Sequence, residues 1–374
     1  MRVGIIFGGR SCEHEISLVS ASHVMSHLDR SKYEVMPIGI TKDGEWLAGI
    51  EPEQLHLRTT TTMQCDSCSS LSRQSQHPAE CLSQLMFPLN HDHAGTYNAL
   101  DVAFPVMHGS YGEDGTLQGL LEMANVPYVG CGVLGSALGM DKEKMKMIFR
   151  AVGLPIVNFQ AYRRHEWKRS PATIIGTIEQ SLTYPYFVKP ANQGSSIGVT
   201  KVCSRSMLEN AINVAAEYDS KIIIEQSIDC REFSCSVLGN CDPMVSVIGE
   251  SIFAGDFYNY EAKYFDKSSH MVFPAAISPA ISDKICRYAV DAFHALDLCG
   301  LARVDFFLEK GTGQIYINEV NTLPSFTPQC MYPKLCEVSG LPYGLLLDRL
   351  IELALERYAE RSMNRTVVSL PLYA

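Results

Sequence analysis

The N-terminal third of the chain alternates apolar, strand-like runs with segments of helical periodicity. Residues 2–9, RVGIIFGG, form a continuous apolar run that ends in two glycines, which is typical of a strand buried in a parallel sheet. A helical pattern covers 13–28, and a second strand-like run covers 33–41. The same order returns over 99–126, where ALDVAFPVMHG precedes GTLQGLLEMANV. This alternation predicts an open α/β sheet over residues 1–132, with ligands at the carboxyl ends of its strands.

The rest of the chain mixes helices and strands in a less regular order. We expect residues 133–230 to form a small α+β lobe and residues 231–374 a larger α+β domain in which strands predominate. A single helix is predicted over 134–153, ended by Gly153. The other predicted elements are strands at 184–190, 198–202 and 221–228 and helices at 206–218, 282–297 and 343–360. The expected fold class is therefore α/β combined with α+β.

Composition excludes two broad classes of function. A net charge of −10, without any run of Lys or Arg, argues against nucleic-acid binding. No apolar stretch approaches the length of a bilayer-spanning helix, and the apolar start of the chain is too short for a signal peptide. We expect a cytoplasmic protein with no membrane partner, whose 13 cysteines are mostly reduced.

Residues 58–95 form a polar segment rich in Thr, Ser and Cys. Such a composition cannot bury a core and favours an exposed insertion that catalysis does not need. A zinc site is the alternative, because cysteine and histidine are zinc ligands. Its candidate ligands are Cys65, Cys68, Cys81, His91 and His93.

A loop rich in Gly and Ser follows a lysine at residues 189–199, KPANQGSSIGV. Small side chains leave backbone amides accessible, and amides beside a lysine suit a polyanion such as a triphosphate. Taken alone, the stretch also fits an ordinary hairpin turn. Lys142 supplies a second positive charge. Glu225 and Glu232, seven residues apart, could place one carboxylate near the amino group of adenine and the other near ribose hydroxyls.

Polar residues alternate along two strand-like segments near the C-terminus, LARVDFFLE and GQIYINEVNTLP. The alternation places Arg303 and Asp305 on one face of the first strand, and Glu319 and Asn321 on one face of the second. If the strands pair, the four side chains share a patch. Hard oxygen ligands suit magnesium, and an arginine beside them can hold an anion through two hydrogen bonds. A surface cluster of salt bridges is the alternative.

Seven segments, in order, resemble the D-alanine–D-alanine ligases of the ATP-grasp superfamily. They are GGRSCEHEISL, HGSYGEDG, GMDKEKMK, KPANQGSSIGV, FYNYEAKY, LARVDFF and NEVNTLPSFT. The resemblance covers residues 2–355 apart from the 58–95 insertion. It implies an ATP-grasp fold with a Rossmann-like N-terminal domain, and a role in making peptidoglycan precursors. ATP would phosphorylate the carboxylate of one D-alanine, and the amine of a second D-alanine would attack the acyl phosphate.

The resemblance also implies roles for individual residues. Two Mg²⁺ or Mn²⁺ ions would be held by Asp305, Glu319 and Asn321. Glu13 would take the ammonium group of the first D-alanine, with His108 in the same crevice. Arg303 would hold both the acyl phosphate and the carboxylate of the second D-alanine. The residues implied in ATP binding are Lys142, Lys189, Ser195, Ser196, Glu225, Glu232 and Lys263. Ser195 and Tyr264 would link to Glu13 and hold a lid over 250–270 closed. A homodimer is implied as well.

Two positions depart from the family pattern. Ser325 stands where the family usually has glycine, and Cys330 stands where it usually has serine; with Met331, both are implied in binding the second substrate. The backbone amide at 325 survives as an oxyanion donor, provided that no positive φ is needed there. Cys330 is a poorer hydrogen-bond donor than serine, which predicts weaker binding of the second substrate's carboxylate.

Sequence features argue against three other functions. A D-alanine–D-lactate ligase usually lacks the YEAKY pattern, which this chain has. A regulator that has lost catalysis would be indicated by loss of Arg303 or of the metal carboxylates, and all are present. A nicotinamide oxidoreductase is disfavoured, because GGRSCE is not a G-x-G-x-x-G motif and the strand at 33–41 ends without an acidic residue.

Overall fold

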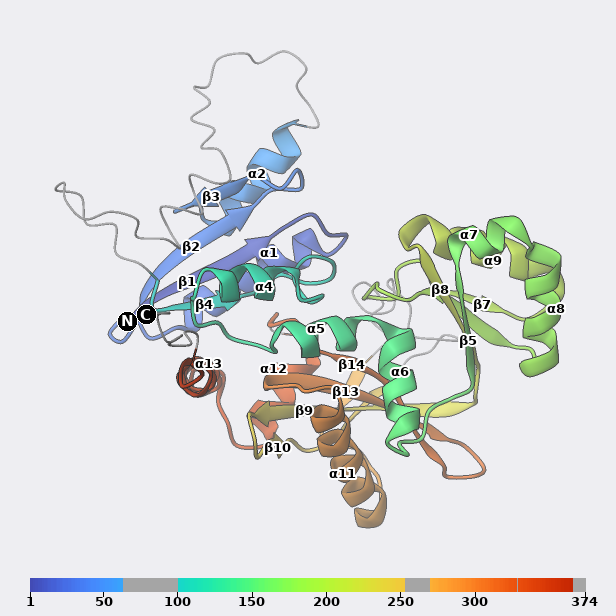
Figure 1. Ribbon diagram of the computed structural model, residues 1–374. Helices are drawn as coiled ribbons and strands as arrows, with labels where there is room; N and C mark the ends of the chain where they lie inside the picture. The colour runs from blue at the N-terminus through green and yellow to red at the C-terminus, as the bar shows by residue number, and fades with distance from the viewer. Residues whose placement is uncertain (63–99, 253–269, 328, 366–374) are drawn as a thin grey trace, which may run out of the picture.

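The computed structural model describes residues 1–62, 100–252, 270–327 and 329–365, which form three β-sheets with helices packed against them (Figure 1). In the N-terminal sheet the strand order is β3-β2-β1-β4, and β1 runs parallel to both β2 and β4. This parallel pairing confirms the predicted open α/β sheet. The strands are β1 (Arg2–Gly8), β2 (Glu34–Ile40), β3 (Trp46–Ala48) and β4 (Val102–Pro105), and the helices are α1 (His14–His27), α2 (Pro52–Thr62) and α4 (Thr116–Met123).

A second, four-stranded sheet has the order β5-β8-β6-β7, and all of its pairs are antiparallel. The loop 191–199 connects β6 to β7, so the glycine- and serine-rich stretch is a hairpin connection at the end of this sheet. Its strands are β5 (Phe159–Arg163), β6 (Tyr186–Pro190), β7 (Thr200–Val202) and β8 (Lys221–Gln226), and its helices are α7 (Arg164–Arg169), α8 (Pro171–Ser181) and α9 (Arg205–Tyr218).

The third sheet has the order β12-β11-β9-β13-β14, with β10 pairing to β9, and its pairs are antiparallel. Apolar side chains of β9, β13 and β14 form one core with those of α11 and of helix α6 (Lys142–Ala151). The strands are β9 (Cys230–Gly239), β10 (Met244–Val245), β11 (Gly249–Ile252), β12 (His270–Val272), β13 (Gly300–Glu309) and β14 (Ile315–Asn321), and the helices are α11 (Pro279–Ala295), α12 (Met331–Val338) and α13 (Tyr343–Ser362).

The prediction of a single helix over 134–153 is wrong. The segment forms two helices, α5 (Val133–Met140) and α6 (Lys142–Ala151), with Asp141 between them in an extended conformation. The Asp141 side chain accepts a hydrogen bond from the backbone N of Lys144 (3.1 Å), so it caps a new helix instead of continuing the old one. Lys221 of β8, almost fully buried, pairs with Asp141 and lies 2.7 Å from Glu143.

Smaller differences concern where elements begin and end. Residues 58–62 of the predicted insertion belong to α2, and both ends of the predicted lid are strands, since 250–252 end β11 and His270 begins β12. The remainder of both segments, and with it the candidate zinc ligands, lies outside the described residues. Helix α11 begins at Pro279, earlier than predicted, because Ser278 caps it. Helix α12 was not predicted. Within the described ranges, no helix is long and apolar enough to cross a membrane.

The Asp141 cap yields a test of how α6 is held. Asp141→Ala removes the cap and one of two carboxylates beside the buried Lys221, so it should lower the free energy of unfolding by roughly 1–2 kcal/mol. Asp141→Asn keeps a capping oxygen and should lose less. Urea unfolding followed by circular dichroism measures both variants, and an Asp141→Ala protein as stable as wild type would contradict the assignment.

Candidate active site

One cavity of about 1000 Å³ is lined by residues of the second and third sheets and by Glu13, His108 and Glu113, which follow strands β1 and β4 of the N-terminal sheet. It gathers every predicted site residue that the structure describes. These are Glu13, His108, Lys142, Lys189, Ser195, Ser196, Glu225, Glu232, Arg303, Asp305, Glu319, Asn321, Ser325, Cys330 and Met331. Lys263 and Tyr264 lie outside the described residues.

The predicted acidic patch is formed by the antiparallel pairing of β13 with β14. Asp305 lies opposite Glu319, and Arg303 lies opposite Asn321. The guanidinium of Arg303 donates to both carboxylate oxygens of Asp305, at 2.8 Å each. Burial opposes the charge of Arg303, but Asp305 and Glu319 outweigh it and raise its pKa. The site therefore holds a permanently charged guanidinium beside two carboxylates and an amide.

Lysines face this patch from the side of α6 and β6. Lys142 Nζ lies 3.4 Å from Glu319 and donates to the carbonyl oxygen of Gln193 at 2.8 Å. Lys189 Nζ lies 2.6 Å from Glu225. Burial lowers the pKa of Lys189, but the Glu225 and Glu319 carboxylates outweigh burial, so the pKa lies above its usual value. Glu225 is buried at the wall of the cavity, and its two oxygens lie against Lys189 and Lys146.

Glu13 and the loop after β6 meet at the other side of the cavity. The Ser195 hydroxyl donates to a carboxylate oxygen of Glu13. Ser195 and Ser196 have φ of 49° and 58°, and Ile197 N bonds to Gly194 O at 3.1 Å, a turn with two left-handed residues that usually requires glycine or asparagine. A Cβ on Gly194 would lie 2.9 Å from Glu13 Oε2. Strain of this kind concentrates at functional sites.

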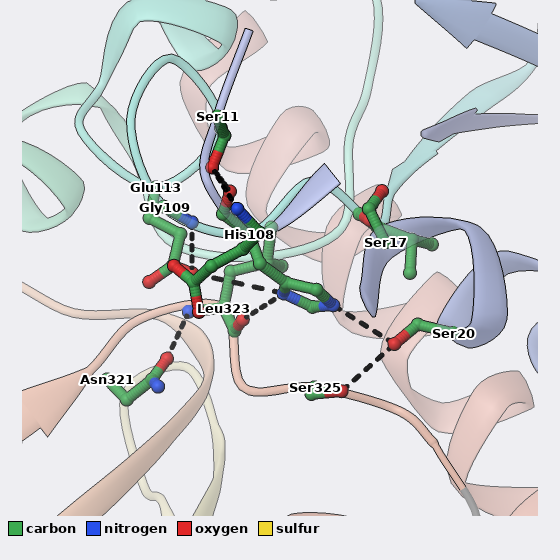
Figure 2. Close-up of polar contacts among 12 residues, drawn as sticks. Ser11, Ser17, Ser20, His108, Gly109, Glu113, Asn321, Leu323 and Ser325 are labelled. Atoms are coloured by element: carbon green, nitrogen blue, oxygen red, sulfur yellow. Dashed lines mark hydrogen bonds and ion pairs between the residues drawn. The ribbon is translucent and has the colours of Figure 1, made fainter. Parts of the chain in front are cut away.

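A hydrogen-bonded chain fixes the tautomer of His108 (Figure 2). His108 Nδ1 lies 3.1 Å from the carbonyl oxygen of Leu323, so Nδ1 carries the proton. Nε2 then accepts from the Ser20 hydroxyl (3.1 Å), and Ser20 accepts from the Ser325 hydroxyl (2.9 Å). Burial lowers the pKa of His108 to about 4, so the ring is neutral near pH 7.

The two departures from the family pattern have defined surroundings. Ser325 is not among the non-glycine residues with positive φ in the described part of the chain, so serine is accommodated there without left-handed strain. Its hydroxyl joins the His108 chain, which glycine could not do. Cys330 precedes α12, and its Sγ lies 2.9 Å from the Thr327 hydroxyl. Met331 begins α12 and is buried.

Three supporting residues were not predicted. Glu113 lines the cavity, accepts from the backbone N of Gly109 at 2.8 Å, and has a pKa raised well above its usual value by burial and by Glu13. Ser234 donates to Asp305 at 2.7 Å. Lys146 lies behind the cavity. It stands four residues after Lys142, and this spacing, which places both on one helical face, could have identified it.

Comparisons with known proteins agree with this geometry. Family models described as the N-terminus and the C-terminus of D-ala D-ala ligase match residues 2–131 and 148–352. The chain belongs to the D-alanine–D-alanine ligase family. A D-alanine–D-alanine ligase of Ruminiclostridium cellulolyticum is 47% identical, over 98% of each chain.

Solved structures of related ligases share the fold. The VanG D-Ala:D-Ser ligase from Enterococcus faecalis matches with a TM-score of 0.78 and 36% identity, over 94% of this chain and 99% of that one. The D-alanine–D-alanine ligase from Coxiella burnetii matches with a TM-score of 0.76 and 32% identity, over 97% of each chain. The predicted ATP-grasp fold is thereby confirmed.

The buried, neutral His108 of this ligase-family site predicts a pH dependence. Its pKa falls from 6.5 to about 4 on folding, so the unfolded chain binds more protons between those values, and stability is lost as the pH falls through that window. The loss at pH 5 relative to pH 7 should be about 2 kcal/mol. Urea unfolding of wild type and His108→Asn at both pH values measures it, because asparagine does not titrate. Equal losses in the two proteins would contradict the assignment.

Proposed function

We propose that this chain joins two D-alanines into D-alanyl-D-alanine at the expense of ATP. The observation that carries the proposal is the single cavity in which Lys142, Lys189 and Arg303 face Asp305 and Glu319, with Glu13 at its other side. Clustered positive charge suits a triphosphate, and the Glu13 carboxylate suits an ammonium group. The relatives that match over nearly the whole chain are named as ligases of this kind, which supports the same activity here.

The proposed reaction has two steps. A carboxylate oxygen of the first D-alanine attacks the γ-phosphorus of ATP, and ADP leaves. The amine of the second D-alanine, after losing a proton, attacks the carbonyl carbon, and inorganic phosphate departs with one of the original carboxylate oxygens. A carboxylate is a poor electrophile, and phosphorylation converts one of its oxygens into part of a good leaving group, inorganic phosphate. Catalysis of such a transfer is mostly positioning and neutralisation of charge.

Individual residues are proposed for each part of this work. Glu13 binds the ammonium group of the first D-alanine, with Ser195 fixing its carboxylate. Lys142 and Lys189 bind the triphosphate. Arg303 stabilises the charge on the acyl phosphate and the tetrahedral intermediate, assisted by the backbone amide of Ser325. The other proposed ATP contacts are Ser196, Glu225, Glu232 and Lys263, and Tyr264 is proposed to close the site.

Asp305, Glu319 and Asn321 fit a magnesium or manganese site by the chemistry of their donor atoms. All three offer oxygen, and strand pairing puts Asp305 opposite Glu319. Among the described residues no three His, Cys, Asp or Glu side chains converge as a metal site, so substrate phosphates and water would complete the coordination. When bound, the ions neutralise charge on the phosphates. We propose two ions.

The second substrate is proposed to be an amine donor, giving a dipeptide. Cys330 and Met331 would line the pocket for its carboxylate, and the thiol of Cys330 gives a weaker hydrogen bond than a hydroxyl. The resemblance to the family also suggests a homodimer in the cytoplasm.

Release of ADP in the presence of ATP and Mg²⁺ tests the function. D-alanine should stimulate release and L-alanine should not, and mass spectrometry should find D-alanyl-D-alanine as the main product when D-lactate competes. Predominant ester would indicate a depsipeptide ligase. ATP binding without turnover on any of these substrates would instead indicate a regulator.

Glu319→Gln tests the metal assignment. The substitution keeps the shape of the side chain and removes the negative charge that would bind the ions. Turnover should therefore fall by at least about a hundredfold, the size of effect seen when one group that stabilises charge in the transition state is removed. Steady-state rates at saturating ATP and D-alanine measure it. The control is Glu309→Gln, because Glu309 is a partly buried carboxylate at the far end of β13 that does not line the cavity. A Glu319→Gln enzyme within a few-fold of wild type would contradict the assignment.

A further inference from the structure

Lys146 is a fully buried lysine behind the active-site cavity. It lies on α6, and its side chain has no exposed surface. Its Nζ donates to the backbone carbonyl oxygen of Asn318 at 2.9 Å and lies 3.2 Å from Oε1 of Glu225. The other oxygen of Glu225 is 2.6 Å from Nζ of Lys189. One buried carboxylate is therefore shared by two lysines.

The pairing of Glu225 with both Lys146 and Lys189 determines the net positive charge at this side of the cavity. Burying an ammonium group is costly unless it is paired, so Lys146 requires a reason to be there. With all three groups ionised, Lys146, Lys189 and Glu225 together carry a charge of +1. If Lys146 were neutral, Glu225 would cancel Lys189 and the three groups would carry no net charge. Lys189 lines the cavity and Lys146 does not, so the excess positive charge faces the cavity through Lys189.

Lys146 also touches the strand that carries the acidic patch. The pairing of β13 with β14 shifts between Asp305/Glu319 and Phe306/Ile317, which leaves Asn318 as an extra, bulged residue. The carbonyl oxygen of Asn318 receives the hydrogen bond from Lys146. Because Glu319 follows directly, one buried side chain connects the lysine side of the cavity with its carboxylate side.

We propose that Lys146 is a positioning residue for nucleotide binding, which engages one oxygen of Glu225 and so leaves Lys189 able to present net positive charge to the triphosphate. The inference rests on the proposed function, because it takes ATP as the ligand. Lys146 does not touch the nucleotide itself. Its effect is transmitted by Glu225 and by the bulge at Asn318.

Binding of ATP with Mg²⁺, measured by titration calorimetry on the full chain, tests this role. Lys146→Met should weaken ATP binding by about tenfold to a hundredfold, since Glu225 would then cancel the charge of Lys189. Lys146→Gln should weaken it similarly, because it can still donate to Asn318 but is uncharged. Lys144→Met, which removes an exposed lysine from the same helix, is the matched control and should bind as wild type does.

The double variant Lys146→Met/Glu225→Gln separates charge from structure. With both charges removed, the charge of Lys189 is no longer cancelled by Glu225, so the double variant should bind ATP more tightly than Lys146→Met does. Recovery is not expected if Lys146 acts only as packing. ATP binding by Lys146→Met and Lys146→Gln equal to wild type, or a double variant no better than Lys146→Met, would overturn the inference. A wild-type chain that binds no ATP would instead overturn the proposed function.

Discussion

Strands β13 and β14 pair antiparallel with Asp305 opposite Glu319 and Arg303 opposite Asn321, and the geometry of the site follows from this register. A slip of one residue would turn all four side chains to the other face of the sheet, which packs against α6 and α11. The buried residues between them, Val304 and Val320, hold the register by filling that core. Packing on one face thus determines the charge pattern on the other.

The cavity contains charges of both signs that satisfy one another in the absence of substrate. Arg303 holds Asp305, Lys142 approaches Glu319, and Lys189 holds Glu225. A triphosphate would have to compete for these cations, and metal ions for these carboxylates. The arrangement is preorganised because most of the groups are at least half-buried and anchored on strands or helix α6, so little reorganisation is needed when the partners are exchanged.

Sequence alternation was sufficient to predict the acidic patch, because a period of two in a strand leaves little freedom once the strands pair. The two-helix arrangement around Asp141 was missed, since good helix formers flank it on both sides, although aspartate is a common N-cap residue. The partners of Glu225 could not be predicted. No local pattern in the sequence pairs it with a lysine, whereas tertiary packing encloses it between lysines from two other elements.

Contacts between residues far apart in the sequence could not be predicted from it either. The link from Ser325 through Ser20 to His108 joins the loop after β14 to α1 and to the end of β4, and no local pattern specifies it. The resemblance to the ligase family pointed to His108, but only the structure shows that a neutral ring with its proton on Nδ1 is what the neighbours require.

We propose that the carboxylate of the first D-alanine is activated by direct phosphorylation. D-alanine labelled with ¹⁸O in its carboxylate tests this most directly, with the released inorganic phosphate analysed by mass spectrometry. Direct phosphorylation predicts one ¹⁸O atom in each phosphate, since the leaving phosphate retains the carboxylate oxygen that attacked the γ-phosphorus. Phosphate free of label during formation of the dipeptide would contradict the acyl-phosphate route.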